Sequence, residues 1–140
     1  MIADSSTLAT LQYEWEGAIQ MRARMRHLVV STFSLNALTS PAFGDILYNL
    51  PFLLAFDVLK QVLLQTREEG QFTSSGSRLV DLMEGAKASL QWLDWPRLRE
   101  AVKRQTEVRH DGKLYGDVRC LQDIADVEAQ LVAWGIIRAA

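Results

Sequence analysis

Apolar residues recur at intervals of three and four along most of the chain, as they do on one face of a helix. Residues 7–35 contain no proline and carry apolar side chains at this spacing, including Leu11 and Trp15. They predict one long first helix. The Ser40–Pro41 step predicts its break, and a short helical turn through Tyr48 is expected to follow.

The most apolar part of the chain begins at Pro51, which suits the first turn of a new helix. Residues 51–69 are apolar on nearly all sides until the last turn, and Gly70 is typical of a helix end. We expect this helix to be the buried centre. Residues 73–76 are loop-like in composition, and Ser77 is expected to cap a short helix over residues 79–86.

Two further helices are predicted near the C-terminus. Asp94 and Pro96 favour the start of a helix that continues to about Arg109, and Asp111-Gly112 favours its end. Its inward stripe consists of Leu98, Ala101, Val102, Gln105 and Val108. The last helix is expected from Asp117 to Trp134-Gly135, with Leu121, Ile124, Ala125, Val127 and Leu131 facing inward.

These elements predict an all-α fold, an up-and-down bundle of about five helices. The chain has 140 residues, of which 49% are hydrophobic and 23% charged, so a single packed domain over residues 1–140 is expected. The tryptophans are expected to anchor the core or an interface; they are Trp15, Trp92, Trp95 and Trp134.

Charge and cysteine usage limit the classes of function. The net charge of -2 offers no global attraction to nucleic acid or to an anionic membrane. Cys120 is the single cysteine, so no intrachain disulfide can form and a reducing cytoplasm is the expected location. The sequence contains no membrane-spanning segment and no cluster with metal-ligand spacing, so we expect neither a metal nor a cofactor.

Residues 97–113 are locally basic. The cations Arg97, Arg99, Lys103, Arg104, Arg109 and Lys113 outnumber the acids Glu100, Glu107 and Asp111. Helical ion pairs from Glu100 to Arg104 and from Lys103 to Glu107 are one explanation. A local phosphate-binding patch is the other.

His110 falls where the basic helix should end. An imidazole with an ordinary pKa of about 6.5 exchanges a proton at cellular pH, so His110 is a candidate acid or base. A histidine at a helix C-terminus also favours the negative end of the helix dipole, which needs no chemistry.

The string KRQTEVRHDGKLYGDVRCLQDIADVEAQLVAWGI, residues 103–136, resembles the end of HEPN domains, in which an arginine, a polar residue and a histidine precede a loop and a final helix. We extend the resemblance over residues 50–137. It implies a bundle that forms a homodimer with both motifs facing one cleft. Many HEPN proteins are metal-independent ribonucleases, several are toxins paired with a nucleotidyltransferase-like antitoxin, and others bind nucleotides or partner proteins.

The motif departs from its commonest spacing. Four residues usually separate the arginine from the histidine, and here that position is Gln105, whereas Arg104 gives a spacing of five. The resemblance makes Arg104 and His110 the candidate catalytic residues, and Gln105, Arg109 and Lys113 the candidate RNA- or phosphate-binding residues. A glutamine amide can hydrogen-bond a phosphate but cannot stabilise a developing negative charge as a guanidinium does.

Two hypotheses follow for function. The first is a HEPN-like module that binds a partner protein, a nucleotide or RNA, with a catalytically weakened site. The alternative is a metal-independent endoribonuclease that acts as the toxin of a toxin–antitoxin pair. In this alternative His110 moves the proton and an arginine stabilises the phosphate.

Overall fold

The computed structural model describes residues 1–35 and 41–139, with all their side chains except those of Arg26 and of residues 28–35 and 41–47. Every regular element in these residues is a helix. The helices are α1 Ser5–Leu35, α2 Pro41–Glu68, α3 Leu79–Ala86, α4 Trp95–Asp111 and α5 Asp117–Ala133. The predicted all-α bundle of about five helices is confirmed.

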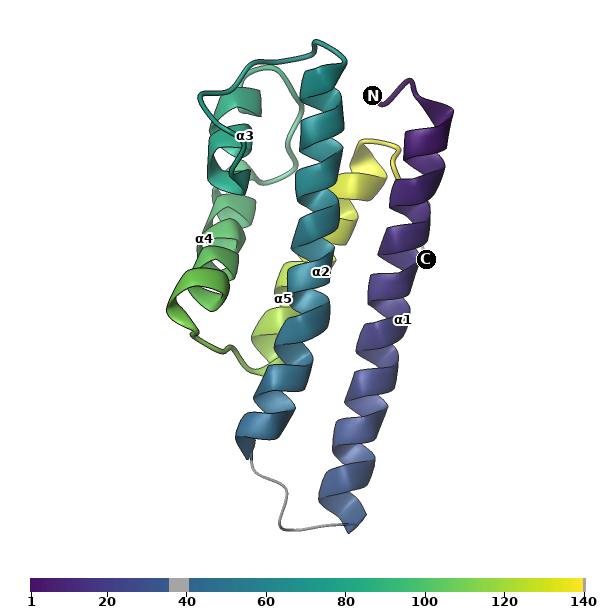
Figure 1. Ribbon diagram of the computed structural model, residues 1–140, viewed down its shortest axis with the longest axis vertical. Coiled ribbons are helices and arrows are strands. Elements are labelled where there is room, and N and C mark those ends of the chain that lie inside the picture. The colour runs from purple at the N-terminus through teal and green to yellow at the C-terminus, as the bar shows by residue number, and fades with distance from the viewer. Residues whose placement is uncertain (36–40, 140) are drawn as a thin grey trace.

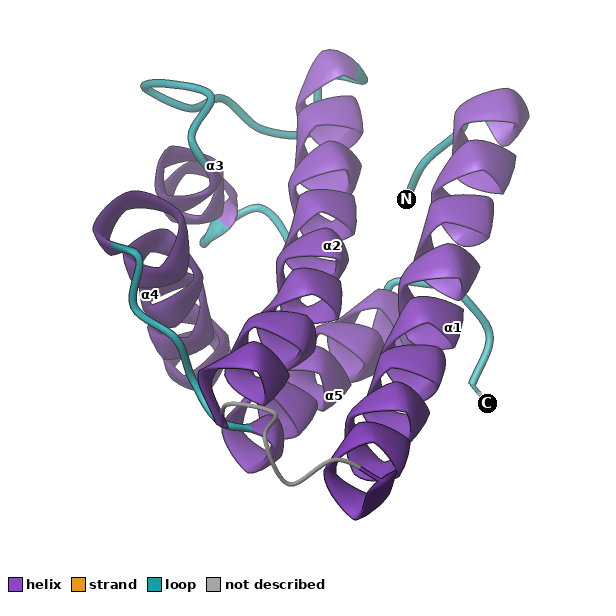
Figure 2. Ribbon diagram, turned by 60° about the horizontal axis from the view of Figure 1, so that its bottom comes forward, coloured by secondary structure: helices purple, strands orange, loops and turns teal. Residues whose placement is uncertain are grey.

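Helix α2 is the centre of the molecule and packs against each of the other four helices. In Figure 1, α1 and α4 run opposite to α2, whereas α5 lies behind α2 and runs in the same direction. Turning the molecule, as in Figure 2, shows α1 along one side of α2 and α3 and α4 along the other. None of the described helices is long and apolar enough to cross a membrane.

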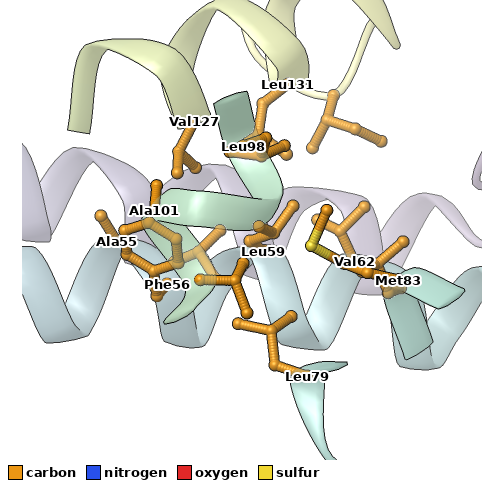
Figure 3. Packing of buried hydrophobic residues seen from close by; sticks show 14 of the residues in the cluster. Ala55, Phe56, Leu59, Val62, Leu79, Met83, Leu98, Ala101, Val127 and Leu131 are labelled. Atoms are coloured by element: carbon orange, nitrogen blue, oxygen red, sulfur yellow. The ribbon is translucent and has the colours of Figure 1, made fainter. Parts of the chain in front are cut away.

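The core forms where α2 meets α3, α4 and α5. Figure 3 shows Phe56 and Leu59 of α2 packed among Met83 of α3, Ala101 of α4 and Val127 of α5. All five side chains are fully buried. At about 25 cal/mol for each Å² of apolar surface removed from water, these contacts provide the main drive for folding.

The structure confirms several predicted helix ends. Asp94 caps α4 by accepting a hydrogen bond from the backbone N–H of Arg97 at 3.1 Å. Gly112 ends α4 with φ at 66°, and Gly70 follows α2 with φ at 81°. Glycine adopts this left-handed conformation without the steric penalty that a Cβ brings.

Three sequence expectations about the elements are wrong. Pro51 does not begin a helix, because α2 already starts at Pro41. Pro51 lacks an N–H and disrupts a helix interior, but Asn49 and Phe52 beside it are buried, at 2% and 0% exposure, and their packing keeps this stretch helical. Ser77 does not cap α3, because Arg78 occupies the cap position and the Ser77 hydroxyl instead accepts from Arg67.

The third error concerns which side of α5 faces the core. Leu121 and Ala125 were expected inside, but both are exposed. Asp123 is fully buried in their stead, because two arginines satisfy its charge. A periodicity rule that ranks residues by hydrophobicity alone places a buried carboxylate outside.

Candidate functional site

A hollow of about 530 Å³ opens between α2, the start of α3 and the second half of α4, and we call it the α4 hollow. It brings together residues that are far apart in the sequence. Its lining consists of Phe56, Asp57, Lys60, Arg78, Leu79, Val80, Gln105, Thr106, Arg109 and His110. Three of the five predicted site residues, Gln105, Arg109 and His110, therefore lie around one space.

Helical geometry explains why α4 presents these residues together. Gln105 and Arg109 are four residues apart, as are Thr106 and His110, so the two pairs form neighbouring rows on one face. The deeper row begins at Gln105, which is 6% exposed, and the outer row ends at the exposed His110. His110 also lies in the last turn, beside the carbonyl end of the helix.

Gln105 is the most unusual polar residue in the hollow. Five polar residues are buried among those described: Asn49, Thr66, Gln105, Asp123 and Gln130. Four of them have hydrogen-bond partners in the protein. The Gln105 amide has none among the described residues, and although the residue is only 6% exposed, solvent still reaches its amide atoms from the hollow.

A fully buried amide without a partner loses hydrogen bonds that it makes in water, which costs about 1–3 kcal/mol; solvent in the hollow spares Gln105 part of this cost. The other buried amides avoid this loss. Gln130 accepts from the backbone N–H of Leu93 at 2.9 Å and donates to the carbonyl of Gln91 at 3.2 Å. The free amide of Gln105 is therefore suited to a group that enters the hollow from outside.

Cations from three helical segments border the same space. Lys60 comes from α2, Arg78 from the start of α3 and Arg109 from α4. Asp57 is the only carboxylate in the lining and forms an ion pair with Arg109. Arg78 Nε lies 3.1 Å from Asp81 Oδ2, and this hydrogen bond lowers the pKa of Asp81.

The lining thus carries three cationic side chains and one carboxylate, with His110 beside them. Its local charge is positive although the chain as a whole is acidic. Lys60 has no ion-pair partner among the described residues. Thr106 contributes an acceptor rather than a donor, because its hydroxyl donates to the carbonyl of Val102 at 3.1 Å.

Arg104 does not border the hollow. Its guanidinium points to α5 and binds both carboxylate oxygens of Asp123, with Nε to Oδ2 at 2.7 Å and Nη2 to Oδ1 at 2.8 Å. This hydrogen bonding raises the pKa of Arg104 and keeps it charged. The neighbouring Arg119 reaches the same carboxylate at 3.0 Å.

Lys113 also lies away from the hollow, in the loop between α4 and α5. Its ammonium is 3.4 Å from Glu107 Oε2 and lies over the ring of Tyr115, and the Tyr115 hydroxyl donates to the same carboxylate. The hydrogen bond from Tyr115, followed by the charge of Lys113, lowers the pKa of Glu107. Asn49 closes the loop by pairing with the backbone of Tyr115.

The helical ion pairs considered for the basic segment are replaced by these longer-range contacts. Arg104 binds Asp123 rather than Glu100, and Glu107 binds Lys113 and Tyr115. Part of the local positive charge therefore stabilises the bundle. Among the cations of residues 97–113, Arg109 is the one that borders the hollow, next to His110.

Sequence reasoning missed Lys60 and Arg78 as site residues. A charge within the most apolar part of the chain is a signal for Lys60, but a lysine three residues from Asp57 is also typical of a helical ion pair, which implies no site. Arg78 gave no such signal. It joins the site because α3 packs against α2, which places Arg78 and Leu79 beside Phe56 at the hollow.

A larger hollow, of about 950 Å³, lies between α1 and α2. Its rim carries the carboxylates of Glu14, Asp57 and Glu68, with Lys60 as the one cation in the lining. This charge disfavours a phosphate. We therefore regard the smaller α4 hollow as the candidate site.

The described residues contain no group of three or more histidine, cysteine, aspartate or glutamate side chains arranged to hold a metal ion. The chain matches no protein-family model, no curated protein and no solved structure, so its resemblance to HEPN domains depends on the motif in residues 103–136.

Proposed function

We propose that the chain is a HEPN-like helical module that binds the phosphate group of a nucleotide or of RNA in the α4 hollow. The observation that carries the proposal is Gln105, whose amide borders the hollow and has no partner in the described protein, beside three cations from different helical segments. A phosphate offers acceptor oxygens to Gln105 and Lys60, which have no partner among the described residues, whereas Arg78 and Arg109 already bind Asp81 and Asp57. We propose a cytoplasmic location together with this function.

The side chains have different roles in this hypothesis. Lys60 and Arg78 attract the phosphate, and Lys60 does so without giving up another ion pair. Gln105 donates its amide N–H deep in the hollow. Arg109 contacts the ligand after exchanging part of its ion pair with Asp57, and His110 lies at the mouth.

Titration calorimetry with AMP, ATP, inorganic phosphate and a short single-stranded RNA tests the proposal. We expect binding of at least one nucleotide or RNA, and a loss of about tenfold or more for Lys60→Met, since a hydrogen bond to a charged group contributes about 1.5–3 kcal/mol. Lys103→Met is the matched control, because Lys103 is exposed on α4 and does not border the hollow. Equal losses in both variants would contradict the site.

A ribonuclease activity is the second candidate function, and the position of His110 beside Arg109 in the hollow favours it. His110 would take the proton from an RNA 2′-hydroxyl or give one to the leaving oxygen. Because Arg104 is bound to Asp123, Arg109 or Lys60 would stabilise the phosphate in its place. A toxin of this kind would have a nucleotidyltransferase-like antitoxin as its partner.

Incubation of the purified chain with RNA in EDTA tests this activity. Cleavage that disappears in His110→Ala and persists in Arg104→Lys would support it. Binding without cleavage, or cleavage that persists in His110→Ala, would exclude catalysis by His110. Only the binding function would then remain. The two proposals are thus separated by one pair of measurements on the same RNA.

A further inference from the structure

Helix α5 is apolar on two opposite sides. At about 100° per residue, Val118, Leu121, Ala125 and Ala129 fall on the side opposite the buried Val127 and Leu131. We call these four residues the outer face of α5. All four are exposed, with Val118 at 68% and Leu121 at 36%.

A helix that covers only one neighbour needs only one apolar side. The first apolar side of α5 is used, because α5 packs against α2 and α4. The outer face faces away from both and is extended by Leu93, which is 64% exposed and borders a small depression together with Ala129. A contiguous apolar helix face is a candidate protein interaction surface.

The order of side chains along the outer face indicates which partner covers it. The large residues, Val118 and Leu121, lie in the first half of α5, and the small residues, Ala125 and Ala129, lie in the second half. When two copies of α5 pack antiparallel about a two-fold axis, each large residue meets a small residue of the other copy. Parallel packing places large residues opposite each other and leaves a gap between the alanines.

The charges beside the face have the same symmetry. Arg119 and Asp126 lie along one edge of the outer face, about 20° apart around the helix. Each has an ion-pair partner in its own chain, since Arg119 lies 3.0 Å from Asp123 and Asp126 lies 2.8 Å from Arg97. In an antiparallel pair, each Arg119 also approaches the Asp126 of the other copy, so the charges at this edge alternate in sign. An isologous interface requires this kind of self-complementarity.

We propose that the outer face of α5 is a homodimer interface in which two copies pack antiparallel through Val118, Leu121, Ala125 and Ala129. This dimer differs from the shared-cleft dimer that the HEPN resemblance implies. Asp57 and Lys60 of the α4 hollow lie on the side of α2 opposite Ala55, Leu59 and Val62, which face the core. The two hollows therefore open on outer surfaces of the dimer and work separately.

Sedimentation velocity over a concentration series that reaches the high micromolar range tests the interface. One helix face is smaller than a standard interface of about 1,600 Å², so we expect reversible dimerisation. Val118→Lys should abolish the dimer while circular dichroism and the thermal midpoint stay unchanged. Tyr13→Lys, at a residue on α1 that is 79% exposed, is the matched control and should dimerise as the parent does.

Ala129→Leu distinguishes specific packing in a dimer from nonspecific hydrophobic association. Leucine keeps the helix propensity of alanine almost unchanged and makes the face more apolar, yet it fills the space that Val118 or Leu121 of the other copy needs. We expect this variant to be monomeric. A parent chain that stays monomeric, a dimer that survives Val118→Lys, or a dimer that Ala129→Leu strengthens would each overturn the proposal.

Discussion

At the scale of the residue, Gln105 combines a structural disadvantage with a functional opportunity. The residue is 6% exposed and its amide has no partner in the described protein, so only solvent in the hollow hydrogen-bonds it. Such a residue is expected where a ligand supplies the missing hydrogen bonds. Its replacement should then weaken binding while the stability changes little.

Gln105→Leu is expected to change the free energy of unfolding by less than about 1 kcal/mol, because the side chain keeps its volume and the amide is hydrogen-bonded by solvent rather than by the protein. The same change should weaken phosphate-ligand binding about tenfold or more. Urea denaturation and calorimetry on one preparation measure both effects. A variant that is less stable than the parent would show that the amide has a partner in the folded protein.

Arg104 and Asp123 form a buried charge pair between α4 and α5. Because Asp123 is fully buried, removing Arg104 leaves its carboxylate with Arg119 alone. Breaking a buried pair on one side costs about 3–5 kcal/mol, and the remaining arginine places the expected loss near the lower end of this range. We expect Arg104→Met to lower the free energy of unfolding by about 3 kcal/mol.

Chemical denaturation of Arg104→Met and of Arg97→Met measures this loss against a control. Arg97 binds Asp126 at 2.8 Å, but its side chain is 55% exposed, so its removal should change stability by less than about 1 kcal/mol. If Arg104→Met folds as stably as the parent and only loses RNA cleavage, Arg104 has the catalytic role that the motif suggested.

At the scale of the element, the loop between α4 and α5 is held by side chains rather than by backbone structure. Glu107 accepts from Tyr115 and pairs with Lys113, while Asn49 of α2 holds the backbone of Tyr115. These contacts set where α5 begins relative to α4. They also make the loop sensitive to acid.

The pKa of Glu107 is below its ordinary value of 4.5, first because Tyr115 hydrogen-bonds the carboxylate and then because Lys113 attracts it. Folding therefore gains stability from this group above pH 4.5, and the gain is lost as the pH falls further and the carboxylate is protonated. Thermal unfolding from about pH 7 to about pH 3 should show a shallower loss of stability for Glu107→Gln than for the parent. Parallel curves would contradict this link.

At the scale of the whole molecule, the bundle divides into a dense part and a peripheral helix. Helices α2, α3, α4 and α5 are joined by several shared interfaces, whereas α1, in the described part of the chain, packs along α2 and meets α5 through the ion pair of Arg22 with Asp117 at 3.5 Å. A hydrogen bond from Gln12 to the backbone of Ile136 links α1 to the C-terminal segment. We infer that local unfolding of α1 requires less free energy than unfolding of helices α2 to α5.

Native-state hydrogen exchange tests this division. Amides of residues 8–21 in α1 should exchange at lower denaturant concentration than amides of residues 55–66 in α2. Trp15→Ala should widen the difference, because Trp15 is 6% exposed and fixes α1 to the core. Exchange of both segments in one cooperative transition would show that the bundle opens as a single unit.

The sequence by itself determined the helical class and most helix ends. Apolar spacing, the Asp94 cap and the glycines at positions 70, 112 and 135 act over a few residues, so they can be read directly. It also placed Gln105 on the inward stripe of α4, as the structure confirms. The sequence did not predict that Pro51 lies inside α2, because packing against distant residues outweighed the tendency of proline to interrupt a helix.

Only the tertiary structure decided which charged side chains pair with one another. Arg104 is four residues from Glu100, yet it binds Asp123 on another helix, and Lys60 and Arg78 meet Gln105 only because α2, α3 and α4 pack together. The outer face of α5 became visible in the same way, once Asp123 proved to be buried and Leu121 exposed. Ion pairing and burial depend on neighbours across the bundle, and one chain read in order does not contain them.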